Sequence, residues 1–231
     1  MTGPADRERE VTAVLDAWDR REGECLIGGY AVSAYGKPRY SRDLDFVIPT
    51  ESTVRARGRL EELGFSVRPG RRPGRPDALP DVLTLYRGPL SVDLMIGQVR
   101  DRGTQVIVPS QWISSRYREM RLLLLTGSTQ RPVRVCRPEA LWVLKIIAGR
   151  NQDLGDLYAL STEAVDLGEV RGILCQVMNP ALRERLGDEA HRLEPRKIYA
   201  DSQAERFLRS SSGTAQRTWE EFKRRFSEVI S

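Results

Sequence analysis

The chain has 231 residues, of which 40% are hydrophobic and 30% are charged, and its formal net charge is +5. This composition is ordinary for a soluble globular protein with one large domain or two small ones, and the positive charge fits a polyanionic partner such as a nucleotide or nucleic acid. Three widely spaced cysteines and a single histidine argue against a disulfide scaffold, a zinc site and catalysis through a Ser-His-Asp or Cys-His arrangement.

The first residues are charged and lack the apolar segment of a signal peptide. The longest apolar run, residues 122–125, is far too short to span a bilayer. We therefore expect a cytoplasmic protein with reduced thiols and no membrane partner.

The spacing of apolar residues predicts the elements of the first half of the chain. The first elements are a helix over 6–19, a strand over 24–27, a short helix over 30–35 and a strand over 43–48. A helix follows that is capped by Thr50 or Ser52 and ended by Gly64, and then a strand over 65–67. Two strands joined at Gly88-Pro89 lie within 81–97, the second over 90–97, and further strands are predicted over 104–108 and 133–136.

Helical patterning dominates from Pro138, because proline suits the first turn of a helix and the adjacent Glu139 favours the positive end of its dipole. Helices are predicted over 138–149, 152–161, 169–178, 181–192 and 201–229, with breaks near 179–180 and 210–213. The sequence therefore predicts an α+β protein. Residues 1–136 form a core with a small mixed β-sheet and flanking helices, and residues 137–231 form a helical domain.

Proline, glycine and arginine dominate RPGRRPGRP, residues 68–76, within a basic loop that covers 68–80. This composition predicts a solvated loop. Two interpretations stay open: a linker between strands, and a basic flap over a polyanion.

Two carboxylates, Asp43 and Asp45, are one residue apart in the strand predicted over 43–48. Side chains at i and i+2 of a strand point to the same face, so the two carboxylates project together. Unpaired like charges in a half-buried strand are costly, and Mg²⁺, which prefers carboxylate and phosphate oxygens, would remove that cost. The alternative is a solvent-facing strand edge, where acidic residues guard against aggregation.

Three further features favour the metal-binding interpretation. Gly28-Gly29 lies between a strand and a helix, where a backbone can approach a phosphate closely. Arg39 and Ser41 precede the acidic pair and suit anionic oxygens. Asp93, inside an apolar strand, is a candidate third carboxylate for a two-metal site, with Asp81 and Asp101 as competitors at strand ends.

The stretch GGYAVSAYGKPRYSRDLDFVI, residues 28–48, followed by a single aspartate on a later strand, resembles the nucleotidyltransferase core of the DNA polymerase β superfamily. A second motif, RPEALWVLKIIAGRNQDLGDLYAL at 137–160, resembles the AbiEii/AbiGii-type and MenT-type branches, many of whose members are toxins of toxin–antitoxin pairs. Together the two motifs cover roughly residues 20 to 160.

This resemblance implies a role for each matching residue. Asp43, Asp45 and Asp93 would bind Mg²⁺ or Mn²⁺, and Asp93 would also be the candidate base. The residues expected to contact the nucleotide or its phosphates are Gly28, Gly29, Arg39, Ser41, Lys145, Arg150, Asp153 and Asp156. Of these, Lys145 would take part in catalysis from the helical domain, which would line the nucleotide cleft, and the two aspartates would orient it.

The expected activity is transfer of a nucleoside monophosphate from an NTP to a hydroxyl group, with release of pyrophosphate. The acceptor stays open between RNA, in particular a tRNA 3′ end, a protein and a small molecule, and a cognate antitoxin is an expected partner of a toxin. Two alternatives are a catalytically silent nucleotide-binding protein of the same fold and a component whose main role is a protein complex.

Overall fold

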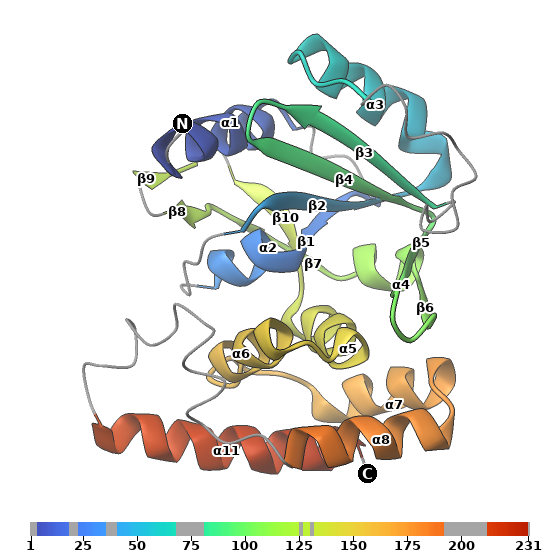
Figure 1. Ribbon diagram of the computed structural model, residues 1–231, viewed down its shortest axis with the longest axis vertical. Helices are drawn as coiled ribbons and strands as arrows, with labels where there is room; N and C mark the ends of the chain where they lie inside the picture. Colours follow the sequence, from blue (N-terminus) through green and yellow to red (C-terminus); the bar gives the residue numbers. More distant parts are fainter. Residues whose placement is uncertain are drawn as a thin grey trace. The chain divides into compact units, whose positions relative to one another are not determined.

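The computed structural model describes residues 4–18, 23–35, 41–67, 81–124, 127–129, 132–191 and 212–230 (Figure 1). The chain divides into two compact units: the sheet unit, with residues 1–100 and 107–137, and the helical unit, with residues 101–106 and 138–231. The predicted α+β class is confirmed, because a mixed sheet with flanking helices is followed by helices alone.

The main sheet holds six strands among the described residues. Their order across the sheet is β3 (Val82–Arg87), β4 (Leu90–Ile96), β2 (Asp43–Ile48), β1 (Cys25–Ile27), β10 (Val133–Cys136) and β7 (Tyr117–Met120). The pairs β4–β2 and β1–β10 are parallel and the other three pairs are antiparallel. Two small hairpins join β5 (Gln98–Arg100) to β6 (Ile107–Pro109), and β8 (Leu123–Leu124) to β9 (Gly127–Ser128).

The sheet unit contains four α-helices among the described residues. They are α1 (Pro4–Ala17), α2 (Gly28–Ala34), α3 (Thr53–Glu62), which follows the 3-10 turn Thr50–Ser52, and α4 (Ser110–Ser114). The predicted end of the first strand at Gly28-Gly29 is confirmed, because β1 stops at Ile27, but α2 begins at Gly28 and not at residue 30. The strand expected over 65–67 is reduced to one bridge, between Ser66 and Tyr86. The basic loop 68–80 lies outside the described residues.

Alternation along β2 and β4 separates a fully buried face from a half-buried one. Leu44, Phe46 and Val92 are at most 1% exposed, and the ring of Trp18, just after α1, stacks on Phe46 with centroids 3.9 Å apart. The aspartates between these residues are half-buried. The period of two in the sequence thus sets which face of the sheet packs into the core.

The helical unit contains α5 (Pro138–Ala148), α6 (Asn151–Leu160), α7 (Leu167–Val177), α8 (Pro180–His191) and α11 (Ser212–Ile230). Helix α5 packs against α6 and α7, and α11 packs against α6, α7 and α8 (Figure 1). Phe222 of α11 contacts the rings of Trp142 and Tyr158, at centroid distances of 6.4 and 6.0 Å. This aromatic cluster joins the last helix to the first two.

The helix boundaries follow the predicted order with small shifts. Helix α7 begins at Leu167 because the carboxylate of Asp166 accepts a hydrogen bond from the amide of Glu169, a cap that the periodicity did not reveal. Of the helix predicted over 201–229, residues 201–211 lie outside the described ranges, and α11 includes Ser212 and Gly213, where a break was expected. No helix in the described part of the chain is both long and apolar enough to cross a membrane.

Phe46→Ala is expected to lower the free energy of unfolding by about 3–5 kcal/mol, because it removes a buried ring and the stacking partner of Trp18. Urea denaturation followed by circular dichroism measures this loss. The control is Val54→Ala, since Val54 is 85% exposed and its truncation should change stability by less than about 0.5 kcal/mol. Equal losses in the two variants would contradict the assignment of this core.

Candidate functional site

The parallel pairing of β2 with β4 brings the two conspicuous aspartates of these strands into register. Asp45 is directly opposite Asp93, and Asp43 is opposite Ser91. Neighbouring strands lie about 4.8 Å apart and paired residues point to the same side, so all three carboxylates occupy one face of the sheet. Residues separated by almost fifty positions in the sequence therefore form one acidic cluster.

Polar side chains flank this cluster on the same face. The hydroxyl of Ser91 donates a hydrogen bond to the carboxylate of Asp43, and Thr84 on β3 is opposite Asp93. Ile27 on β1 is opposite Asp45. The cluster thus has hydroxyl-bearing residues toward the β3 edge and an apolar neighbour toward β1.

The register places like charges side by side at a half-buried position. Directly opposed like charges on adjacent strands are destabilising, and partial burial weakens the screening by water. A cation that binds between the two carboxylates would reduce their repulsion and so stabilise the fold. This juxtaposition is the main chemical peculiarity of the sheet unit.

Gly28 packs directly against the carboxylate of Asp45. A β-carbon at Gly28 would lie 2.0 Å from Oδ2 and 2.9 Å from Cγ of Asp45, which is closer than any real contact. The residue also has a φ of +69°, which side chains disfavour. Both observations require glycine, so the glycine motif and the aspartate motif of the sequence meet in space.

Of the other three residues expected to contact a phosphate, the structure describes two, Gly29 and Ser41. The carbonyl of Gly29 accepts a hydrogen bond from Ser33, and the carbonyl of Ser41 accepts one from the Tyr30 hydroxyl at 3.3 Å. Arg39 lies outside the described residues. The phosphate contacts expected of Gly28, Gly29, Arg39 and Ser41 stay predictions.

The two competing aspartates are engaged elsewhere. The carboxylate of Asp81 accepts a hydrogen bond from Gln98 and lies 3.7 Å from Nε of Arg100. The carboxylate of Asp101 accepts bonds from the backbone amides of Gly103 and Thr104, at 2.9 and 2.7 Å, within its own turn. The strand register places Asp93, and neither of these two residues, opposite Asp45.

The chemistry of the acidic cluster fits a hard divalent cation. Its donors are carboxylate oxygens, which Mg²⁺ and Mn²⁺ prefer. Within the described ranges, no three or more Asp, Glu, His or Cys side chains are already arranged to enclose a metal ion.

A second charged cluster lies within the helical unit. Nζ of Lys145 on α5 lies 2.7 Å from Oδ1 of Asp153 and 2.8 Å from Oδ2 of Asp156, both on α6. Nε of Arg150 lies 2.7 Å from Oδ2 of Asp153. Lys145, Asp153 and Asp156 are each at most 8% exposed, whereas the Arg150 side chain is 73% exposed. The nucleotide contacts expected of these four residues stay predictions.

Burial and charge act in opposite directions on the pKa of Asp153. Burial alone would raise it, but the adjacent charges and hydrogen bonds of Lys145 and Arg150 outweigh burial and hold the pKa below its ordinary value. Asp153 is therefore ionised at neutral pH, and the cluster balances two positive against two negative charges. The ion pairs of Lys145 with Asp153 and Asp156 join α5 to α6.

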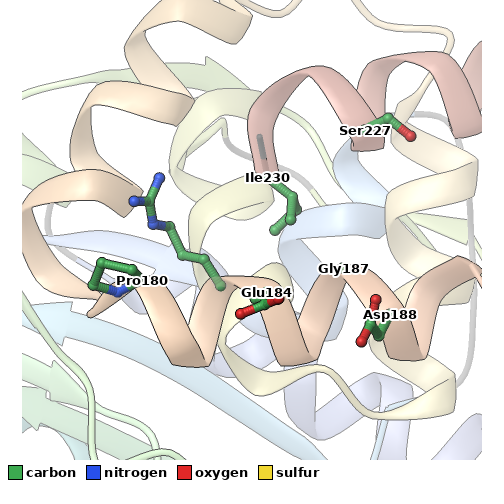
Figure 2. Close-up of a pocket in the computed structure, with 7 residues that line it drawn as sticks. Pro180, Glu184, Gly187, Asp188, Ser227 and Ile230 are labelled. Carbon is green, nitrogen blue, oxygen red and sulfur yellow. The ribbon is translucent and has the colours of Figure 1, made fainter.

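Neither the cysteines nor the hollow between α8 and α11 is a better candidate for the functional site than the acidic cluster. The three cysteines are free, and burial raises the pKa of the Cys25 thiol to about 12, with the charge of Arg134 opposing it only in part. Cys25 is thus no nucleophile at neutral pH. The hollow has a volume of about 420 Å³, and Gly187 lies close to Ile230 in its lining, since a β-carbon at Gly187 would be 2.8 Å from Cγ2 of Ile230. Figure 2 shows Glu184 and Asp188 among the lining residues.

Sequence reasoning missed Ser91 and Thr84, because neither residue belongs to the aspartate or glycine motif. A period of two extended from Asp93 along β4 includes Ser91, so a signal for that residue was present. Thr84 could be found only after the pairing of β3 with β4 was known.

No protein-family model and no curated protein matches the chain. Its structure is similar to one described as a "putative nucleotidyltransferase from H. pylori", with a TM-score of 0.49 and 16% sequence identity over 98% of this chain and 94% of that one. It is also similar to JHP933 from Helicobacter pylori, with a TM-score of 0.49 and 15% identity over 98% and 91% of the two chains. At this level of similarity neither structure assigns an activity to the chain.

Gly28→Ala is expected to lower the free energy of unfolding by roughly 2–3 kcal/mol, because the methyl group strains the backbone and collides with the Asp45 carboxylate. The matched control is Gly58→Ala in α3, where a β-carbon meets no atom within 4 Å. Helix propensity should make that variant about 0.5–1 kcal/mol more stable. Chemical denaturation of both variants tests the contact, and effects of the same sign would contradict it.

Asp153→Asn is expected to cost roughly 3 kcal/mol of stability at pH 7, because it leaves Lys145 and Arg150 short of one negative charge. The folded-state pKa of Asp153 is lowered, so its contribution is complete above the unfolded value near 3.9 and is lost as the pH falls further. Urea denaturation at several pH values should show a constant difference from the parent protein above about pH 5 and a shrinking one below about pH 4. The control Glu61→Gln breaks an exposed pair with Arg57 and should cost under about 1 kcal/mol. A difference that does not change with pH would contradict the assigned pKa.

Proposed function

We propose that this protein is a metal-dependent nucleotidyltransferase that moves a nucleoside monophosphate from an NTP to a hydroxyl acceptor. The observation that supports this proposal is the register of Asp45 with Asp93, with Asp43 on the same face. Opposed carboxylates on adjacent strands are unfavourable in a structural role, and they suit a site that shares a cation with a triphosphate.

Asp43, Asp45 and Asp93 would hold Mg²⁺ or Mn²⁺. When bound, such an ion neutralises charge on the phosphate oxygens and aligns the triphosphate. The hydroxyl oxygen of the acceptor forms a bond to the α-phosphorus, the bond from this phosphorus to the bridging oxygen of the β-phosphate breaks, and pyrophosphate leaves. The hydroxyl proton passes to the carboxylate of Asp93. The contribution of the protein is mainly positioning and charge compensation, as is general in phosphoryl transfer.

The local packing supports these roles for the aspartates. Ser91 donates to Asp43 and so restrains the orientation of that carboxylate. Gly28 lies close to the Asp45 carboxylate and limits its space, since a β-carbon at Gly28 would be 2.0 Å from Oδ2 of Asp45. Preorganised carboxylates of this kind lose little freedom when a cation and a substrate bind.

The proposal also concerns the molecule whose hydroxyl group accepts the nucleoside monophosphate. An RNA, including a tRNA 3′ end, fits the net charge of +5 better than a neutral small molecule does, and a protein hydroxyl is the second candidate. A role as a toxin with a cognate antitoxin rests on the resemblance of the motifs at 28–48 and 137–160.

Asp45→Asn and Asp93→Asn are each expected to lower nucleotidyl transfer by roughly a hundredfold or more, because each removes one charge from the acidic cluster. The measurement uses purified protein, each α-³²P-labelled NTP in turn, Mg²⁺, total RNA and cell protein. Label on RNA or on protein identifies the acceptor class, and the labelled NTP that reacts identifies the base.

The matched control is Asp81→Asn, which removes a carboxylate that lies outside the acidic cluster and should keep the parent rate. Full activity in Asp45→Asn would show that the site is wrongly assigned. Measurable binding of NTP without any labelled product would favour a catalytically silent nucleotide-binding protein.

A further inference from the structure

The acidic cluster continues toward the β3 edge of the sheet as a row of hydroxyl-bearing side chains. Thr84 on β3 is directly opposite Asp93, and Tyr86 is opposite Ser91. Beyond β3, Ser66 pairs with Tyr86 through a single bridge. Paired residues point to the same side of a sheet, so these side chains share the face of the carboxylates. Thr84 and Tyr86 are half-buried and Ser66 is exposed, and we call these three residues the β3 patch.

The opposite side of the acidic cluster is closed by protein. Ile27 on β1, which is opposite Asp45, is 4% exposed. Helix α2 packs on β1 and β2, and Gly28 at its start lies against the Asp45 carboxylate (Figure 1). Thr84, on the other flank, is half-buried and so keeps contact with solvent. A substrate therefore reaches the carboxylates more readily from the β3 side than from the β1 side.

The chemistry of nucleotidyl transfer gives the two sides different roles. The attacking oxygen and the leaving oxygen lie roughly in line, on opposite sides of the α-phosphorus. The expected phosphate contacts, Gly28 and Gly29, are on the β1 side of Asp45, so pyrophosphate would leave on that side. The acceptor hydroxyl would then arrive from the β3 side, where Asp93, the proposed base, lies between Asp45 and the β3 patch.

The β3 patch has the chemistry of a nucleoside site. It offers hydroxyl groups and one aromatic ring, and it carries no formal charge. Among the described residues, the Thr84 hydroxyl has no hydrogen-bond partner. Nucleobases stack on aromatic side chains, and ribose hydroxyls both donate and accept hydrogen bonds. A phosphate or a charged side chain would instead be recognised by charged groups.

The spacing within the patch suits one nucleoside. Cross-strand neighbours have β-carbons about 4.5–5.5 Å apart, and diagonal neighbours are about 7–8 Å apart. Thr84 is therefore next to the Asp93 carboxylate, and Tyr86 is the diagonal neighbour of Asp93. A terminal ribose bound at Thr84 would bring its hydroxyl to Asp93 while the attached base reaches the ring of Tyr86.

A peptide acceptor fits this edge less well. The N–H of Tyr86 donates to the carbonyl of Ser66 at 2.9 Å, and the carbonyl of Tyr86 accepts from the N–H of Ser66 at 3.0 Å. A peptide therefore cannot add to β3 as a further strand at this point, which is the common way for a sheet edge to bind a peptide. The patch recognises its ligand through side chains.

We propose that the β3 patch binds the 3′-terminal nucleoside of an RNA acceptor. Tyr86 stacks on the terminal base, and Thr84 hydrogen-bonds the terminal ribose and holds its hydroxyl next to Asp93. This inference rests on the proposed nucleotidyl transfer and names its acceptor. An RNA end is favoured because it combines a base, a ribose hydroxyl and a polyanionic chain that suits the net charge of +5.

The first test measures whether the protein recognises the terminal base. Binding of a single-stranded, eight-nucleotide RNA with a 5′-fluorescein label is followed by fluorescence anisotropy, with either adenosine or an abasic ribose at the 3′ end. The variants are Tyr86→Leu, which removes the ring, and Tyr86→Phe, which keeps it. Circular dichroism and the urea midpoint verify that each variant is folded.

The parent protein and Tyr86→Phe should bind the RNA with the complete end roughly five- to a hundredfold more tightly than the abasic RNA, which is the range for one base stacked on an aromatic ring. Tyr86→Leu should lose most of this preference. A parent protein without the preference, or a Tyr86→Leu variant that keeps it, would overturn the proposal.

The second test concerns the Thr84 hydroxyl. Thr84→Val has nearly the same shape and should raise KM for the RNA roughly three- to tenfold, as expected for the loss of one hydrogen bond, without changing KM for the NTP. Thr84→Ser should restore the parent value. The matched control is Thr162→Val, which removes an exposed hydroxyl from the helical unit and should leave both constants unchanged. Equal effects of the two valine variants would contradict the role of Thr84.

The binding test also separates this proposal from the proposed function. Asp45→Asn should keep the preference for the complete end while it loses labelling, since stacking does not require the reaction. If Tyr86→Leu keeps the preference while labelling still depends on Asp45, the nucleoside site is wrong and the activity stands. If the preference depends on Tyr86 but no NTP labels any acceptor, the nucleoside site stands and the activity is wrong.

Discussion

The parallel pairing of β2 with β4 is the constraint on which the proposed chemistry depends, because it places the carboxylates of Asp45 and Asp93 side by side. The neighbouring structure accommodates that unfavourable pairing. Gly28 leaves space for one carboxylate, and Ser91 donates a hydrogen bond to the adjacent Asp43. A cation that is shared with a substrate would relieve the remaining repulsion. The proposed function thus follows from the repulsion between two carboxylates that the fold holds side by side.

The buried charges of the helical unit are paired with one another. Lys145 lies between Asp153 and Asp156, and Arg150 supplies the second positive charge from an exposed position. Buried charges add little net stability when they are paired, but the loss of one partner is costly. The cluster links α5 to α6 through the two ion pairs of Lys145.

The sequence by itself determined the α+β class, the strand that carries Asp43 and Asp45, and the order of most helices, because these depend on local periodicity, glycine and proline. Only the tertiary structure decided that Asp93 lies beside Asp45, that Gly28 touches this carboxylate and that Lys145 bridges two aspartates. Contacts of this kind depend on strand register and helix packing, which residue patterns along one segment do not encode.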